Sequence, residues 1–156
     1  TPLKVRTFFA AQIIANLALS VVQALIIMGV GVALFGGHIY GNIAWVLVLV
    51  MLGNIVFLNL GFIVGANAKT VRAAEGFGNA IALPMMFLSA VFFPKEGLPR
   101  VLGEIVEYLP LSPMLDSLRG VALEGKAIWA YPDELLILTG WIILSSILAV
   151  RVFRFN

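Results

Sequence analysis

"IAWVLVLVMLGNIVFLNLGFIVGA", residues 43–66, contains no charged side chain. About 20 consecutive apolar residues are enough for an α-helix to cross the hydrocarbon core of a bilayer. The whole chain shares this character, because 62% of its 156 residues are hydrophobic, 12% are charged and its mean hydropathy is +1.06. A soluble domain has about 45–50% apolar and about 25% charged residues. We therefore expect an all-α membrane protein, with residues 1–156 forming a single transmembrane domain.

The charged residues are clustered, and the gaps between the clusters predict four spans. No charge occurs between Arg6 and Lys69, between Glu75 and Lys95, or between Glu134 and Arg151. The expected transmembrane helices are residues 8–35, 43–66, 77–93 and 135–150. A glycine-rich turn joins the first two into an antiparallel hairpin. Pro84 should kink the third, because it removes one backbone hydrogen bond.

Residues 94–133 are too polar to form a span. From Leu98 to Leu109 the apolar residues recur at helical spacing, which predicts an amphipathic helix. The letters LPLSP break this helix, and Ser112 followed by Pro113 is typical of the start of another. We expect two short helices over about residues 98–124, forming a hairpin that lies at, or dips into, one membrane face before the last span.

The positions of lysine and arginine predict the orientation in the membrane. With a cytoplasmic N-terminus, six of the ten basic residues lie inside and close to span ends: Lys4, Arg6, Lys69, Arg72, Arg151 and Arg154. The chain is therefore expected in the cell membrane as a multi-pass protein with both termini of this chain in the cytoplasm. The short helical hairpin then lies on the outer face.

Four polar residues form one stripe on the first span, because Gln12, Asn16, Ser20 and Gln23 are spaced by four, four and three positions. Two interpretations are open. The stripe forms hydrogen bonds between helices, or it faces a solute pathway or a groove between two subunits. In the second span, Gly61 and Gly65 indicate close helix packing, with Gly53 near the same face. Asn54 and Asn59 lie roughly 140° apart on that helix, so they define no common stripe.

The sequence offers no set of residues for catalysis, metal binding or cofactor binding. It has no cysteine and one histidine, and no carboxylate falls within an expected span. Asp116 and Arg119 are three residues apart, which favours a salt bridge on a helix. Residues 120–127, GVALEGKA, fit a P-loop except that Ala127 replaces the required hydroxyl. Because they follow an amphipathic helix on the expected outer face, we interpret Gly120 and Gly125 as helix-end residues instead.

The stretch from Gly78 to Gly125 resembles a known family. It is similar to the type 2 permeases of ATP-binding cassette (ABC) exporters, particularly the drug-resistance and daunorubicin-type branch. The matching features are Asn79, Pro84, FLSAVFFP at 87–94, Pro99, LPL at 109–111 and DSLRG at 116–120. The opening TPLKVRTFF also looks like the family's coupling helix leading into its third span. The resemblance then implies that the four spans are the family's third to sixth, in an N-terminally truncated fragment that should not transport alone.

This resemblance implies a transporter component and not an enzyme. In the family, two permease subunits, expected here as a homodimer surrounded by membrane lipid, each rest on a separate ATPase subunit that holds ATP and Mg²⁺. ATP hydrolysis there moves a drug, lipid or glycan outward. The implied contact with the ATPase subunit falls on Thr1, Pro2, Leu3, Lys4 and Arg6. The outer hairpin would close the pathway, and its implied site residues are Leu109, Pro110, Asp116 and Arg119.

A second interpretation is that the same spans belong to a membrane scaffold or assembly subunit that moves no solute. ATPase activity that rises when a partner ATPase is reconstituted with the chain would separate the exporter from the scaffold. No nucleic-acid partner is expected. The neutral polar stripe is compatible with drugs, lipids and sugars, so the sequence does not select the substrate.

Overall fold

The computed structural model describes residues 5–89 and 100–155 of the chain. Within these two ranges the secondary structure consists of six α-helices and one short 3₁₀ turn, and this confirms the all-α class. The helices are α1 (Val5–Phe35), α2 (Ile43–Asn67), α3 (Val71–Leu88), α4 (Arg100–Tyr108), α5 (Leu111–Leu123) and α6 (Pro132–Phe155), and the turn is Ile128–Ala130.

Three of the described helices are long and apolar enough to cross a membrane. The qualifying stretches are Ala10–Phe35, Ile43–Asn67 and Pro132–Val152, with mean hydropathies of 2.4, 2.5 and 2.2. They correspond to the expected spans 8–35, 43–66 and 135–150. The expected third span, 77–93, is not confirmed, so neither is the count of four. Its helix α3 starts at Val71 and thus includes Arg72 and Glu75, while residues 90–93 lie outside the described part.

Side-chain caps explain where two of the helices begin. Asn42 precedes α2, and its Oδ1 accepts a hydrogen bond of 2.8 Å from the Ala44 amide. Thr70 precedes α3 and accepts a bond of 3.2 Å from the Ala73 amide through its hydroxyl. Such caps satisfy amide donors that have no partner within the helix. Pro84 lies inside α3 as predicted, where it cannot donate the usual backbone bond.

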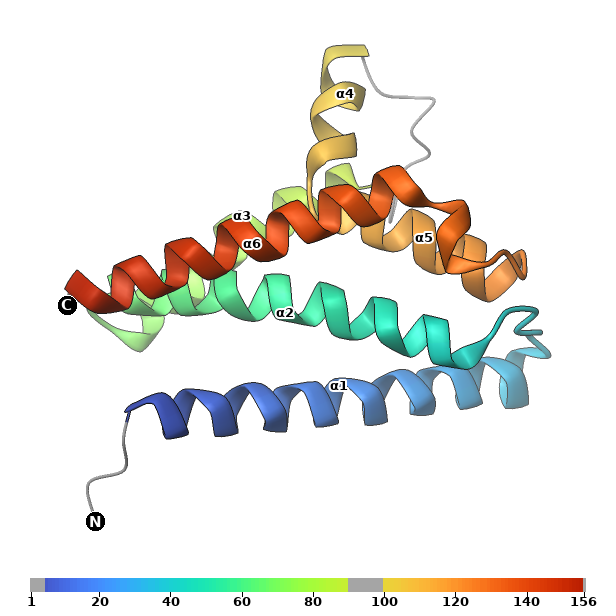
Figure 1. Ribbon diagram of the computed structural model, residues 1–156, viewed down its shortest axis with the longest axis horizontal. Coiled ribbons are helices and arrows are strands. Elements are labelled where there is room, and N and C mark those ends of the chain that lie inside the picture. The colour runs from blue at the N-terminus through green and yellow to red at the C-terminus, as the bar shows by residue number, and fades with distance from the viewer. Residues whose placement is uncertain (1–4, 90–99, 156) are drawn as a thin grey trace.

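The long helix α2 lies between α1 on one side and α5 and α6 on the other (Figure 1). The buried core forms only on the α5 and α6 side, and it consists of Val46, Leu49, Val121, Ile128 and Leu138. No described residue of α1 is fully buried. The helix α1 therefore packs along α2 and contributes half-buried side chains such as Met28 to the edge of the core.

The short helix α5 runs beside the first half of α2 in the opposite direction. Its Met114 packs against Gly53, the eleventh residue of α2, and its Val121 lies against Gly41, just before α2 begins. At about 1.5 Å per residue, Gly53 is about 15 Å along α2, or half of a hydrocarbon core of about 30 Å. The start of α5 therefore lies beside the middle of α2, as a hairpin that dips inward would require, and the position of the hairpin in the membrane stays a prediction.

The junction between α4 and α5 lies at a similar depth along α6. The indole nitrogen of Trp141, the tenth residue of α6, donates a hydrogen bond of 2.7 Å to the Tyr108 carbonyl at the end of α4. The predicted start of the second helix is wrong by one or two residues, since α5 begins at Leu111 after Pro110. The Ser112 hydroxyl is not a cap but is buried within the first turn. Residues 98 and 99 of the expected hairpin lie outside the described part.

The loop between α1 and α2 is fastened to the end of α5. The Tyr40 amide donates to the Ala122 carbonyl at 3.0 Å. Gly125 follows α5 with a φ of +68°, a left-handed conformation that suits glycine, so its reading as a helix-end residue is confirmed. The same reading is wrong for Gly120, which lies within α5 and is buried against the Tyr131 side chain. The GVALEGKA stretch therefore forms the end of α5 and packs against the neighbouring loops.

Candidate functional site

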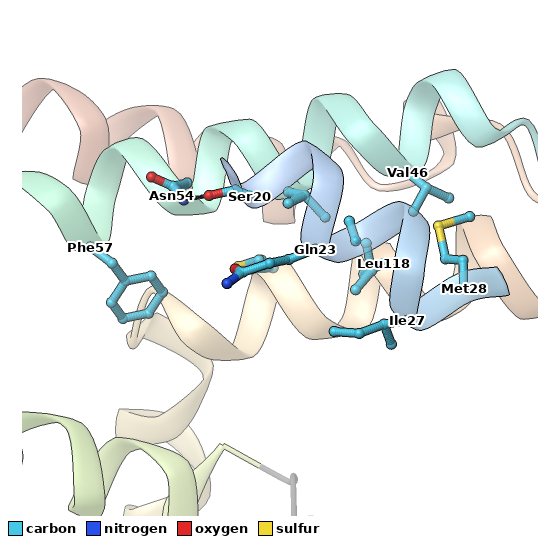
Figure 2. Close-up of a pocket in the computed structure, with 11 residues that line it drawn as sticks. Ser20, Gln23, Ile27, Met28, Val46, Asn54, Phe57 and Leu118 are labelled. Atoms are coloured by element: carbon cyan, nitrogen blue, oxygen red, sulfur yellow. Dashed lines mark hydrogen bonds between the residues drawn. The ribbon is translucent and has the colours of Figure 1, made fainter. Parts of the chain in front are cut away.

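A cavity of about 410 Å³ lies where α1, α2 and α5 meet (Figure 2). This volume falls within the range of about 300–1,000 Å³ that is usual for small-molecule sites. All eleven lining residues are uncharged: Ser20, Gln23, Ala24, Ile27 and Met28 from α1, Val46, Val50, Asn54 and Phe57 from α2, and Met114 and Leu118 from α5. The cavity thus has apolar walls with three polar side chains.

Two of these polar side chains connect α1 to α2. Asn54 donates a hydrogen bond from Nδ2 to the Ser20 hydroxyl, as the dashed line in Figure 2 marks. The Ser20 hydroxyl in turn donates to the Asn16 carbonyl at 2.7 Å. The other amide atom, Asn54 Oδ1, is buried and has no hydrogen-bond partner among the described residues. Asn54 therefore lines the cavity as a residue, while its amide oxygen is shielded from it.

The polar stripe predicted on the first span divides into two halves. Ser20 and Gln23 line the cavity, whereas Gln12 and Asn16 do not. Asn16 donates from Nδ2 to the Gln12 carbonyl at 2.8 Å within its own helix. Ser20 takes part both in a bond between helices and in the cavity wall, so the two interpretations of the stripe meet at this residue. A role for the stripe in solute passage stays a prediction.

Sequence reasoning did not identify Asn54 as a cavity residue, although the angle between Asn54 and Asn59 on α2 indicated that they face different neighbours. Asn59 donates from Nδ2 to the Ser145 and Ser146 hydroxyls of α6 at 3.2 and 2.9 Å. The separation of roughly 140° between the two asparagines therefore reflects two neighbours, α1 on one side of α2 and α6 on the other. Polar residues on opposite sides of a buried apolar helix indicate contacts with two different helices.

The two glycine positions highlighted in α2 do not pack as predicted. At Gly61 and Gly65, an added Cβ would meet no described atom within 4 Å. At Gly53, an added Cβ would overlap the Met114 side chain of α5. Close approach to α2 within this chain thus occurs at Gly53, beside the cavity.

None of the remaining predicted site residues is among the described residues that line the cavity. The described residues do not include Thr1, Pro2, Leu3 and Lys4. Arg6 lies in the first turn of α1, and its side chain is outside the described part. Leu109 is half-buried and Pro110 is buried at the α4–α5 junction. Asp116 is half-buried and Arg119 is exposed, one turn apart on α5. Their roles in the expected contacts stay predictions.

One exposed ion pair lies near the end of α5, outside the candidate site. Lys126 Nζ is 2.6 Å from Glu124 Oε2, and both side chains are more than half exposed. The hydrogen bond that the Lys126 ammonium donates to the Glu124 carboxylate, together with the negative charge of that carboxylate, raises the pKa of Lys126 above its ordinary value. These charges contribute nothing to the lining of the cavity, which is neutral.

Comparison with known proteins identifies the family. The model of the ABC-2 type transporter family matches residues 1–123. The chain belongs to this family. The match runs from α1 to the end of α5, so every element that lines the cavity lies within it. With three helices able to span a bilayer, this ABC-2 family member is a multi-pass membrane protein.

Several relatives share part of their sequence with this ABC-2 chain. The linearmycin resistance permease protein LnrN of Bacillus subtilis is 28% identical over 61% of this chain and 24% of its own length. Nodulation protein J of Rhizobium leguminosarum bv. trifolii is 29% identical over 62% of this chain and 37% of its own. ABC transporter G family member 20 of Dictyostelium discoideum is 23% identical over 88% of this chain and 19% of its own.

The chain spans less than half of the length of each of these three relatives. No solved structure matches it significantly.

Proposed function

We propose that this chain is the membrane part of an ABC exporter permease that moves an uncharged drug, lipid or glycan outward. The observation that carries the proposal is the neutral cavity between α1, α2 and α5 in a chain of the ABC-2 family. The names of two relatives, a resistance permease and an ABC transporter, support the same activity.

The chemistry of the cavity suits passage through a membrane. Apolar side chains such as Ile27, Phe57 and Leu118 can cover the body of a lipid-soluble molecule, and Ser20, Gln23 and Asn54 can pair with its polar groups. A charged group would gain no opposite charge from the lining residues. We therefore propose an uncharged substrate.

The energy source and the partners belong to the same proposal. A separate ATPase subunit would bind ATP and Mg²⁺, and Thr1, Pro2, Leu3, Lys4 and Arg6 would lie at its contact. A second permease subunit would complete the pathway as a homodimer. The start of α1 and the end of α6 lie at the same end of the helices (Figure 1), which supports placing both termini of this chain on the cytoplasmic side of the cell membrane. The α4–α5 hairpin would then close the outer end of the pathway.

The test compares two glutamines of one helix in the complete permease, expressed with its ATPase. Gln23 lines the cavity and Gln12 does not, so Gln23→Leu should reduce export while the matched control Gln12→Leu should not. Export is measured as ATP-dependent loss of three uncharged probes from cells: Nile red, a nitrobenzoxadiazole-labelled ceramide and a nitrobenzoxadiazole-labelled glucosylceramide. Unchanged export by a well-folded Gln23→Leu variant would contradict the assignment of this cavity to the pathway. A complex that exports no probe and whose ATPase activity is unaffected by all three would support the scaffold alternative.

A further inference from the structure

The side of α2 that faces the cavity has one position without a side chain. Four residues at helical spacing line the cavity from this side of α2: Val46, Val50, Asn54 and Phe57. Gly53 lies on the same side, three residues after Val50 and four before Phe57, yet it is buried and does not line the cavity. A neighbouring group therefore covers α2 at position 53.

The group that covers Gly53 is the side chain of Met114. A Cβ added at Gly53 would overlap the sulfur and the terminal methyl group of Met114, so the thioether lies directly on the backbone of α2. Met114 is half-buried and itself lines the cavity, as does Leu118 one turn later on the same face of α5. The end of Met114 thus separates Gly53 from the cavity and forms the wall at this point.

A wall made of methionine can move without disturbing the helices. Three rotatable bonds and a polarisable thioether let this side chain fill irregular spaces and tolerate change. Because protein interiors are close-packed, a displaced side chain moves into the empty space that it already borders. For Met114 this space is the cavity of about 410 Å³. A larger residue at position 53 would therefore push the thioether into the cavity, whereas a shorter side chain at position 114 would enlarge the cavity.

We propose that Met114, resting on Gly53, is a specificity-determining residue that sets the largest uncharged molecule the cavity admits. The lining is uncharged and mostly apolar, so size and shape are the main properties by which it discriminates between uncharged molecules. Glycine at position 53 lets the thioether lie flat on α2, which keeps the cavity wide. This inference rests on the proposed function, because it takes the cavity as the place where the substrate binds.

The test uses three uncharged aromatic alcohols of increasing size, 1-naphthalenemethanol, 1-pyrenemethanol and 3-perylenemethanol. Each carries the same hydroxymethyl group, so the probes differ only in their ring systems. Binding of the tritium-labelled probes to the complete permease and ATPase complex in lipid nanodiscs is measured by scintillation proximity. Affinities are expressed relative to partition into empty nanodiscs, since the larger rings are more lipid-soluble. The readout is the affinity for each larger probe divided by that for the naphthalene probe.

Substitutions at the two positions should shift this size preference in opposite directions. Gly53→Ala should lower the affinity ratios of the larger probes about tenfold, because the displaced thioether takes up space of about one methyl group. Met114→Ala should raise the same ratios. Adding Gly53→Ala to Met114→Ala should then change them little, since no thioether is left to be displaced. Equal changes for all three probes, which a purely structural role predicts, would overturn the proposal.

Two substitutions of the same kinds away from the cavity are the matched controls. Gly61→Ala adds a Cβ to the same helix where no described atom lies within 4 Å. Met86→Ala shortens an exposed methionine of α3 that does not line the cavity. Both should keep the ratios of the unmodified complex, and a shift in either as large as that in Gly53→Ala would overturn the proposal. If Gly53→Ala fails to assemble, unchanged ratios in Met114→Ala alone would also overturn it.

The outcome is separable from that of the proposed function. Affinity ratios that do not respond to Met114→Ala would overturn the size limit, even if Gln23→Leu reduces export. Ratios that respond as expected, in a complex that exports no probe, would support the size limit while contradicting the exporter.

Discussion

Met114 of α5 packs closely against Gly53 of α2, where a Cβ at position 53 would overlap the end of the Met114 side chain. Met114 also lines the cavity between α1, α2 and α5. The contact therefore fixes how deeply α5 lies beside α2 and forms part of the wall of the candidate site.

Substituting Gly53 with alanine should destabilise the protein, because the added Cβ would overlap the sulfur of Met114. Overpacking costs about 1–3 kcal/mol, and because the flexible end of Met114 can yield, we expect a loss near the lower value. Thermal unfolding of the complete permease in detergent micelles measures the effect. Adding Met114→Ala to Gly53→Ala should recover most of the loss, since it removes the overlapping atoms.

The control for this prediction is Gly61→Ala in the same helix. An added Cβ there meets no described atom within 4 Å, so the unfolding temperature should not fall. If both alanine variants unfold at the same temperature as the unmodified protein, the close packing of α5 on α2 is wrong.

Gly41→Ala should also be destabilising, but a second substitution should not rescue it. The Cβ would overlap the backbone carbonyl of Val121, which no side-chain change can remove. The loop must then shift and lengthen the bond of 3.0 Å from the Tyr40 amide to the Ala122 carbonyl. Hydrogen exchange of the Tyr40 amide should accelerate in Gly41→Ala and remain slow in Gly53→Ala. Slow exchange in both variants would argue against this contact.

The bonds from Asn59 to Ser145 and Ser146 should stabilise the packing of α2 on α6. Replacing both serines with alanine leaves the asparagine amide without these partners and should cost about 1–2 kcal/mol. Adding Asn59→Leu should restore part of this loss, because the polar group is then absent altogether. Unfolding in a denaturant series gives the free energy of unfolding for the double serine variant, for Asn59→Leu alone and for the triple variant. Strictly additive losses would indicate that the three side chains do not interact.

Trp141→Phe should loosen the α4–α5 junction while preserving the apolar bulk of the side chain. It removes the indole N–H that donates to the Tyr108 carbonyl at 2.7 Å. A net loss of about 1 kcal/mol is expected, accompanied by faster proteolysis near residues 108–111. Trp129→Phe is the matched control, because Trp129 is 66% exposed and lies in the turn before α6. Equal proteolysis of the two variants would contradict a bond that holds the junction.

The long apolar runs predicted three of the spans to within a few residues, because a segment in lipid must satisfy its own backbone bonds and therefore forms a helix. The short helices α4 and α5 were also foreseeable, from amphipathic spacing and from the proline break between them. The helix α3 was predicted less well, since its start depends on the local cap at Thr70 and not on where the apolar run begins.

The sequence by itself determined which segments become helices and which sides of a helix carry polar groups, since both follow from periodicity within one segment. Only the tertiary structure decided which of these groups meet. Ser20 and Asn54 are 34 residues apart, and their contact depends on the packing of α1 against α2. In the same way, Gly53 packs against α5 while Gly61 does not, because α5 extends only beside the first half of α2. The cavity therefore arises from how three helices pack.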